Sequence, residues 1–123
     1  MALISPNISV FDENNLHIIQ WGPAKFGDTF KPISRGDIVD RSIQCDGTFG
    51  VGTVVNIQGS NNAISTTSGN YYNLTDPFSN VIAMTAPGIH QITEVTSWMR
   101  PFIASGDTTE QITVTVCARR SFK

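Results

Sequence analysis

The stretch that decides the fold reads Gly88-Ile-His-Gln-Ile-Thr-Glu-Val-Thr-Ser-Trp-Met-Arg-Pro-Phe-Ile-Ala-Ser-Gly-Asp-Thr-Thr-Glu-Gln-Ile-Thr-Val-Thr-Val-Cys-Ala-Arg-Arg120. It is rich in β-branched and aromatic residues, and Ser105-Gly106-Asp107 is a strong turn signal within it. After this turn, apolar and polar side chains alternate with a period of two, which predicts a strand with one face on a core. The apolar positions are Ile112, Val114, Val116 and Ala118.

The rest of the chain repeats this mixture of short apolar segments and turn residues. Strands are expected at Leu16–Trp21, near Thr29–Ile33, and at Arg41–Asp46, Thr53–Gln58, Tyr71–Leu74 and Val81–Met84. About eight or nine short strands at even spacing, with no amphipathic helical pattern between them, predict an all-β fold. We expect a single antiparallel β-sandwich, jelly-roll-like in its connections.

Glycines and prolines give finer expectations about the ends of these strands. Gly22-Pro23 is expected to end the first strand of the domain. Glycines 47, 50 and 52 fit neither phosphate-binding spacing, so we expect them to form a hairpin between two adjacent strands. Pro101 lies inside an apolar run, which favours an edge position or a bulge.

The chain divides into an N-terminal arm, residues 1–15, and a β-sandwich domain, residues 16–123. The arm mixes a few apolar residues with Pro6 and the pair Asn14-Asn15, a composition typical of turns and extended backbone. It is expected either to bind a partner as an arm or to form a frayed end or short edge strand.

Composition excludes several classes of function. The chain has 123 residues, a net charge of −2 and only 15% charged residues, so a large positive field for nucleic acid is absent. No apolar run is long enough to cross a membrane, and the first residues lack a signal-peptide pattern, so we expect synthesis in the cytoplasm. Cys45 and Cys117 are expected to be free thiols, buried or half-buried.

No constellation of residues demands chemistry, so we expect no enzymatic activity, no metal and no cofactor. His17 and His90 have no neighbours at metal-ligand spacing, and Asp37 and Asp40 are expected to remain solvated. The aromatic residues allow two interpretations, a sugar-binding face or a core and subunit interface, and the second is favoured. These residues are Trp21, Trp98, Tyr71 and Tyr72.

From Arg41 onward, the order of motifs resembles a family of small virion proteins of tailed bacteriophages that includes capsid decoration, or cement, proteins. The stretches that carry the resemblance are Arg41-Ser-Ile-Gln-Cys-Asp-Gly-Thr-Phe-Gly50, Val54-Val-Asn-Ile-Gln-Gly-Ser-Asn61, Asn73-Leu-Thr-Asp-Pro77, Gly88-Ile-His-Gln-Ile-Thr-Glu94, Met99-Arg-Pro101 and the segment from Gly106-Asp-Thr-Thr109 to Ala118-Arg-Arg120. They span about two thirds of the chain. The first 40 residues carry much less of the resemblance.

The resemblance implies a capsid decoration protein that binds the outer surface of a phage head at capsomer boundaries and stabilises the shell. Its partner would be the major capsid protein, it would itself be a dimer or trimer, and its final location would be the virion. Another virion component, such as a head-tail connector or tail protein, and a carbohydrate-binding module stay open as alternatives. We expect the capsid contacts in residues 1–15, 25–40 and 59–70, because these are polar and rich in turn residues.

Overall fold

The computed structural model describes residues 2–11, 15–34, 38–62 and 70–120, and in this part every regular element is a β-strand. The prediction of an all-β protein is therefore confirmed. The strands are β1 (Leu3–Ile4), β2 (Asn7–Phe11), β3 (Leu16–Ala24), β4 (Thr29–Phe30), β5 (Ile33–Ser34), β6 (Ile38–Thr48), β7 (Val54–Ser60), β8 (Tyr72–Asn73), β9 (Ala83–Met84), β10 (Gly88–Ile92), β11 (Trp98–Ser105) and β12 (Gln111–Arg120).

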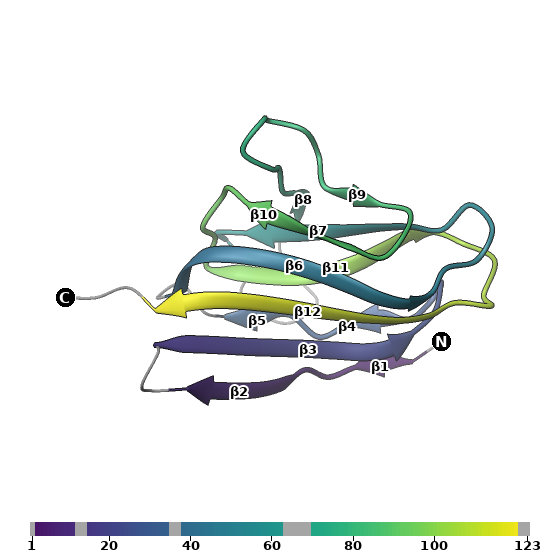
Figure 1. Cartoon of the computed structure of the whole chain (residues 1–123), viewed down its shortest axis with the longest axis horizontal. Helices are drawn as coiled ribbons and strands as arrows, with labels where there is room; N and C mark the ends of the chain where they lie inside the picture. The colour runs from purple at the N-terminus through teal and green to yellow at the C-terminus, as the bar shows by residue number, and fades with distance from the viewer. Residues whose placement is uncertain (1, 12–14, 35–37, 63–69, 121–123) are drawn as a thin grey trace.

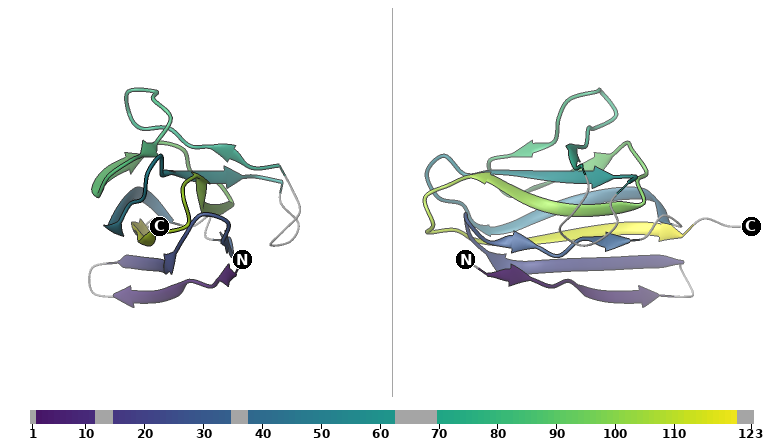
Figure 2. Two further views of the ribbon diagram at one scale, coloured as in Figure 1. Left: turned by 90° about the vertical axis from the view of Figure 1, so that its right-hand side faces the viewer. Right: turned by 180° about the vertical axis from the view of Figure 1, so that it is seen from behind.

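The strands form two antiparallel sheets that pack face to face as a β-sandwich (Figure 1). One sheet has the order β10-β6-β12-β3-β2, and the other has the order β5-β11-β7-β8, with β9 also paired to β7. A short parallel pair of β1 and β4 lies beside them. Figure 2 shows the two layers from the side and from behind. The jelly-roll connection pattern stays a prediction.

Strand β12 is the central strand of the sheet with the order β10-β6-β12-β3-β2. It pairs with β6 on one side and β3 on the other. Its four alternating apolar residues are at most 1% exposed, whereas the side chains between them are half-buried or exposed. The period of two therefore predicted correctly which face of this strand meets the core.

The core between the sheets combines aliphatic residues with one large aromatic residue. Trp21 is fully buried, and its indole nitrogen donates a hydrogen bond to the backbone oxygen of Lys31 at 2.9 Å. Cys45 is also fully buried, and desolvation of the thiolate, with a smaller effect of the Asp46 charge, raises the pKa of the thiol to about 12. Cys45 and the half-buried Cys117 are both free, as expected.

The structure corrects two expectations about glycine. Strand β3 does not end at Gly22-Pro23 but continues to Ala24. Gly22 has a φ of +128°, and a Cβ there would lie 2.6 Å from the backbone oxygen of Ile112. Glycine therefore accommodates a bulge in β3, where Gly22 and Pro23 lie opposite the single residue Thr113 of β12. Glycines 47, 50 and 52 do not form a hairpin, because β6 and β7 belong to different sheets and both edges of β6 are occupied by β10 and β12. The segment instead connects the two layers.

Pro101 lies where the sequence predicts a proline can be tolerated. It is opposite Ile57 of β7, while on its other side β5 pairs only with Trp98 and Met99. Among the described residues no strand therefore pairs with that side of β11 at Pro101, so the missing backbone N–H breaks no ladder bond there.

The N-terminal segment forms strands of the sandwich. β1 pairs with β4, and β2 pairs with β3 along its whole length, which corresponds to the edge-strand alternative. Ile4 packs against the core, but every residue of β2 is exposed. β2 is therefore an added edge that contributes no side chain to the buried core.

Candidate functional site

The strongest polar cluster lies at one end of the sandwich and is built around Glu110. Its side chain is 3% exposed and accepts hydrogen bonds from the Thr53 hydroxyl at 2.6 Å, the Asp107 backbone N–H at 2.7 Å and the Phe26 backbone N–H at 3.0 Å. Asp107 in turn accepts a hydrogen bond from the backbone N–H of Val51 at 2.8 Å. The two carboxylates thus tie three loops together, and we name this end of the molecule the carboxylate lock.

The carboxylate lock has the chemistry of a structural element. Burial alone would raise the pKa of Glu110, but the hydrogen bonds from Thr53, Phe26 and Asp107 outweigh it and hold the pKa below its usual value. The pKa of Asp107 is also lowered, chiefly by hydrogen bonds from Thr109 and Val51. Carboxylates held ionised by backbone donors are poor proton donors near neutral pH, so the lock fixes loops and offers no general acid.

The histidines and the remaining acidic residues considered for chemistry do not come together. His17 is buried in β3, His90 is exposed on β10, and Asp40 pairs with the exposed Arg119 at 3.3 Å. Asp37 lies outside the described residues. Within the described part of the chain, no group of three His, Cys, Asp or Glu side chains is placed to hold a metal ion, and no helix is long and apolar enough to cross a membrane.

The four aromatic residues weighed for sugar binding do not share a face. Trp21 is in the core and Trp98 is half-buried at the start of β11. Tyr71 is half-buried beneath the guanidinium of Arg100, which lies 3.9 Å from its ring centroid, whereas Tyr72 is 70% exposed. The core interpretation is confirmed for Trp21, and Tyr72 is left as the member with a ring open to solvent.

Among the described residues, the most exposed large apolar side chain is on the loop between β8 and β9. Phe78 is 85% exposed, and Figure 1 shows that its loop projects beyond both sheets. The Asp76 carboxylate holds the turn by accepting hydrogen bonds from the backbone N–H groups of Phe78 at 2.9 Å and Asn80 at 3.0 Å. Two backbone bonds between Asp76 and residues Ser79 and Asn80 close the same turn. An aromatic ring is thus presented on a loop of fixed shape.

The base of this loop is fixed as well. Thr75 and Val81 form a β-bridge, and the buried residues Leu74 and Ile82 anchor both ends in the core. Glu94 accepts hydrogen bonds from the Thr75 hydroxyl at 2.6 Å and backbone N–H at 2.8 Å. We name residues 75–81 the presenting loop. Sequence reasoning identified the turn at Asp76-Pro77 but missed Phe78, although an aromatic residue inside a strong turn signal was the available clue.

A cleft of about 390 Å³ lies beside the predicted contact segment 59–70. Four asparagines contribute to its lining, together with Glu94 and the exposed Tyr72, although most of the surface inside the cleft is apolar. The asparagines are Asn61, Asn62, Asn70 and Asn73. Residues 63–69 of the predicted segment lie outside the described residues. The cleft offers amide groups and one ring, which is chemistry suited to polar protein loops or to sugars.

The other predicted contact segments are only partly surface elements. Within residues 25–40, Phe30 and Ile33 are 4% and 5% exposed and belong to the core, so the expectation that this whole segment is a polar contact surface was wrong for these two residues. The reason is that two-residue strands are too short to show a period. Residues 2–11, in contrast, are exposed apart from the half-buried Ile4 and Pro6.

Comparison with known proteins adds no identification. The chain matches no protein-family model and no curated protein.

Proposed function

We propose that this chain is a capsid decoration, or cement, protein that binds the outer surface of a bacteriophage head at capsomer boundaries and stabilises the shell. The observation that carries the proposal is the presentation of Phe78 on the presenting loop, with the ring in solvent and the backbone held by Asp76. Such a side chain contributes nothing to this domain's own core. It has the properties of an anchor for another protein.

The energetics favour a protein partner. Burying a phenylalanine side chain in a partner contributes about 1.5–3 kcal/mol, and aromatic anchors dominate many interfaces. Because the loop is already ordered by its hydrogen bonds, binding does not carry the cost of ordering it. Val81, 52% exposed at the end of the same loop, extends the apolar surface.

A cement role uses many copies of such a modest contact. Each copy placed across a capsomer boundary adds to the barrier against shell rupture, and the sum over the shell is large. This role needs no catalytic group, metal, cofactor, nucleic acid or membrane. The partners are the major capsid protein and further copies of the chain, as a dimer or trimer; the protein is made in the host cytoplasm and ends on the virion. Another virion component is the alternative.

A second candidate function rests on the asparagine-lined cleft. Tyr72 is 70% exposed at its margin, and rings of this kind stack on sugar faces while amides bind hydroxyl groups. Glycan-array binding that is lost in Tyr72→Ala and retained in Phe78→Ser would favour this function over capsid binding.

The test uses capsids stripped of decoration proteins and the purified full chain. Phe78→Ser is expected to lower shell affinity at least tenfold with an unchanged melting temperature. The matched control is Val51→Ser, which alters a side chain that is 84% exposed on a different loop and should bind normally. Equal binding of the two variants to the stripped capsids would show that Phe78 does not contribute to the contact. Failure of the unaltered chain to bind shells or to raise their heat resistance would overturn the cement assignment.

Copy number separates cement from the other virion parts. A decoration protein is present in numbers comparable with the capsid protein, whereas a connector forms a single ring. The copy number is measured by quantitative mass spectrometry of purified particles. A number that corresponds to a single ring would contradict the cement assignment and favour the connector alternative.

A further inference from the structure

Strand β2 is an edge without the usual protection. One of its sides pairs with β3, and Figures 1 and 2 show no described strand along the other side. Its sequence, Asn7-Ile-Ser-Val-Phe11, contains no charge and no proline, and its register with β3 has no bulge. Natural edge strands normally carry one of these features, because unpaired backbone groups invite another strand.

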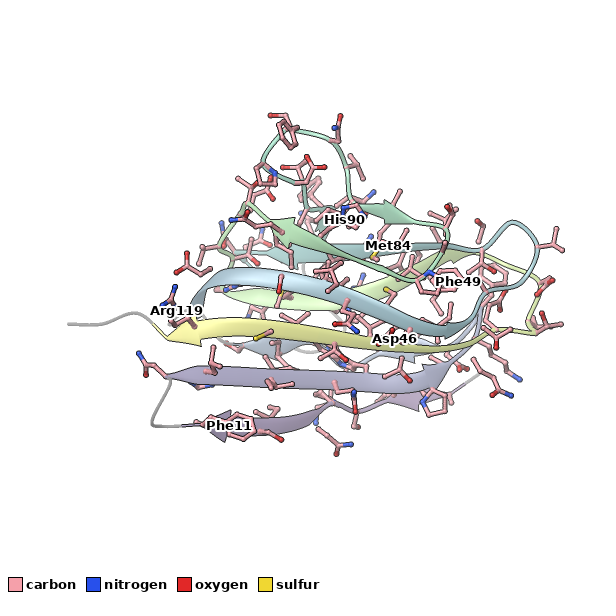
Figure 3. All side chains as sticks on the ribbon, viewed as in Figure 1. Phe11, Asp46, Phe49, Met84, His90 and Arg119 are labelled. Atoms are coloured by element: carbon pink, nitrogen blue, oxygen red, sulfur yellow. The ribbon has the colours of Figure 1, made fainter. Side chains whose placement is uncertain are left out.

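The exposed apolar side chains of β2 further favour contact with another protein at this edge. Ile8 and Val10 are 41% and 47% exposed, and they lie opposite the buried Ile19 and His17 of β3. Directly opposed residues lie on the same face of a sheet. Ile8 and Val10 are therefore on the face of the sheet that meets the core, but they are exposed because the second sheet does not cover them. Phe11, 49% exposed, lies at the far end of β2 (Figure 3).

A groove of about 300 Å³ runs along the same open side of the sandwich. It lies between Pro6 and Ile8 on one side and Pro32 and Ile33 on the other. Ser5, Lys31 and Ser34 complete its lining, so the groove combines apolar and polar side chains, and it leaves room beside β2 for side chains from outside the chain.

We propose that β2 pairs antiparallel with β2 of a second copy about a twofold axis at Ser9. Ile8 then lies opposite Val10 of the second copy, and Asn7 lies opposite its Phe11. The pairing joins the β10-β6-β12-β3-β2 sheet of one copy to the same sheet of the second copy, which gives one continuous sheet. The β5-β11-β7-β8 sheets of both copies then lie on the same side of it. The inference rests on the self-association within the proposed function, and it specifies the surface and the register.

A second copy fits this edge better than an unrelated strand for two reasons. Because β2 is uncharged, its copy brings no like charges into opposition, which would otherwise destabilise the pair. In the Ser9-centred register, odd residues oppose odd residues and even residues oppose even residues. The backbone N–H and C=O groups that point away from β3 belong either to the odd or to the even residues of β2. In this register they face the same groups of the second copy and can form hydrogen bonds with them.

The other sheet edges are less suited to this pairing. β5 and β8 have two residues each. β10 is as long as β2, but it carries exposed His90 and Gln91, with Ile89 as its one exposed aliphatic residue. A contact between β2 and a different edge would also be heterologous and would propagate into fibres, whereas β2 with β2 closes as a dimer.

Sedimentation equilibrium of the full chain over a wide concentration range tests the inference. The unaltered chain is expected to form a reversible dimer. Val10→Lys should raise its dissociation constant at least tenfold, since it places a charge in the apolar contact. The matched control is Ile89→Lys, which changes an exposed residue in the opposite edge strand of the same sheet and should leave the dimer intact. A strictly monomeric unaltered chain, or a dimer lost in Ile89→Lys and kept in Val10→Lys, would overturn the proposal.

A mixing experiment tests the register itself. Ile8→Glu and Val10→Lys should each be monomeric alone, but mixed they should form a heterodimer, because the new carboxylate and ammonium face each other across the axis. Absence of the heterodimer while the unaltered chain dimerises would contradict the Ser9-centred register. Shell occupancy by the unaltered chain is measured in parallel. An unaltered chain that is monomeric and still decorates shells would refute this inference and leave the cement role standing. A dimer that never binds shells would refute the cement role and leave this inference standing.

Discussion

The carboxylate lock and the β2 edge are opposite solutions to the problem of unpaired backbone groups. At the lock, Glu110 and Asp107 satisfy backbone N–H groups from three loops and close that end of the sandwich. At β2, backbone groups and apolar side chains are left facing solvent. The comparison teaches that the contacts that close the fold and the surfaces proposed for recognition are located in different parts of this small domain.

The largest effect is expected at the lock. Glu110→Ala removes the acceptor of three hydrogen bonds in a buried position, which should lower the free energy of unfolding by about 2–4 kcal/mol. Urea denaturation measures this loss. Asp40→Ala is the control, because its ion pair with Arg119 is exposed and should change stability by less than about 1 kcal/mol. Equal losses in both variants would remove the distinction between lock and surface.

The pH dependence of stability should also come from the lock. Because the folded pKa values of Glu110 and Asp107 are lowered, the unfolded chain binds more protons as pH falls below about 4.5. Stability is therefore fully present above the unfolded carboxyl pKa values and is lost as pH falls through the folded ones. Glu110→Gln should have a shallower acid loss in thermal melts at several pH values. An unchanged acid slope would exclude Glu110 as its source.

Removing the β2 edge should matter less for folding. Deleting residues 1–11 removes an all-exposed strand and the partial burial of Ile4, so a loss of about 1 kcal/mol is expected, with the dimer abolished. Calorimetry and sedimentation of the same sample give both values. A deletion that unfolds the domain would show that the edge belongs to the folding core, contrary to the comparison.

The smallest change in stability is expected at the presenting loop. Asp76→Ala removes the acceptor for the backbone N–H groups of Phe78 and Asn80 in an exposed turn, which should cost less than about 1 kcal/mol. Shell affinity should still fall, because the loop must then be ordered on binding. Normal affinity in Asp76→Ala combined with weak affinity in Phe78→Ser would show that the ring matters and its preorganisation does not.

Much of the fold could be predicted, and the reasons differ between elements. The buried face of β12 was predicted correctly because its alternation runs through a strand buried on one face. The partner sheets of β6 and β7 could not be predicted, because adjacency in sequence does not say whether the chain turns back or crosses to the other layer. Phe30 and Ile33 were missed as core residues because two-residue strands carry no periodic signal.

The candidate surface was less accessible from sequence. The N-terminal segment was identified as exposed, yet its pairing with β3 depends on a partner that local pattern does not name. Phe78 looked like one apolar residue in a turn, and its importance comes from exposure and from hydrogen bonds that only the structure shows. The Glu110 contacts join residues more than fifty positions apart, which no spacing rule predicts.

Hydrogen exchange of the chain on decorated shells, compared with dilute free protein, tests the account most directly. We predict new protection of the backbone amides in residues 7–11 and 75–81, because these form the proposed dimer edge and shell contact. Residues 105–110 should exchange equally in both states. Protection confined to the carboxylate lock, with β2 and the presenting loop unchanged, would contradict the separation of stability from recognition.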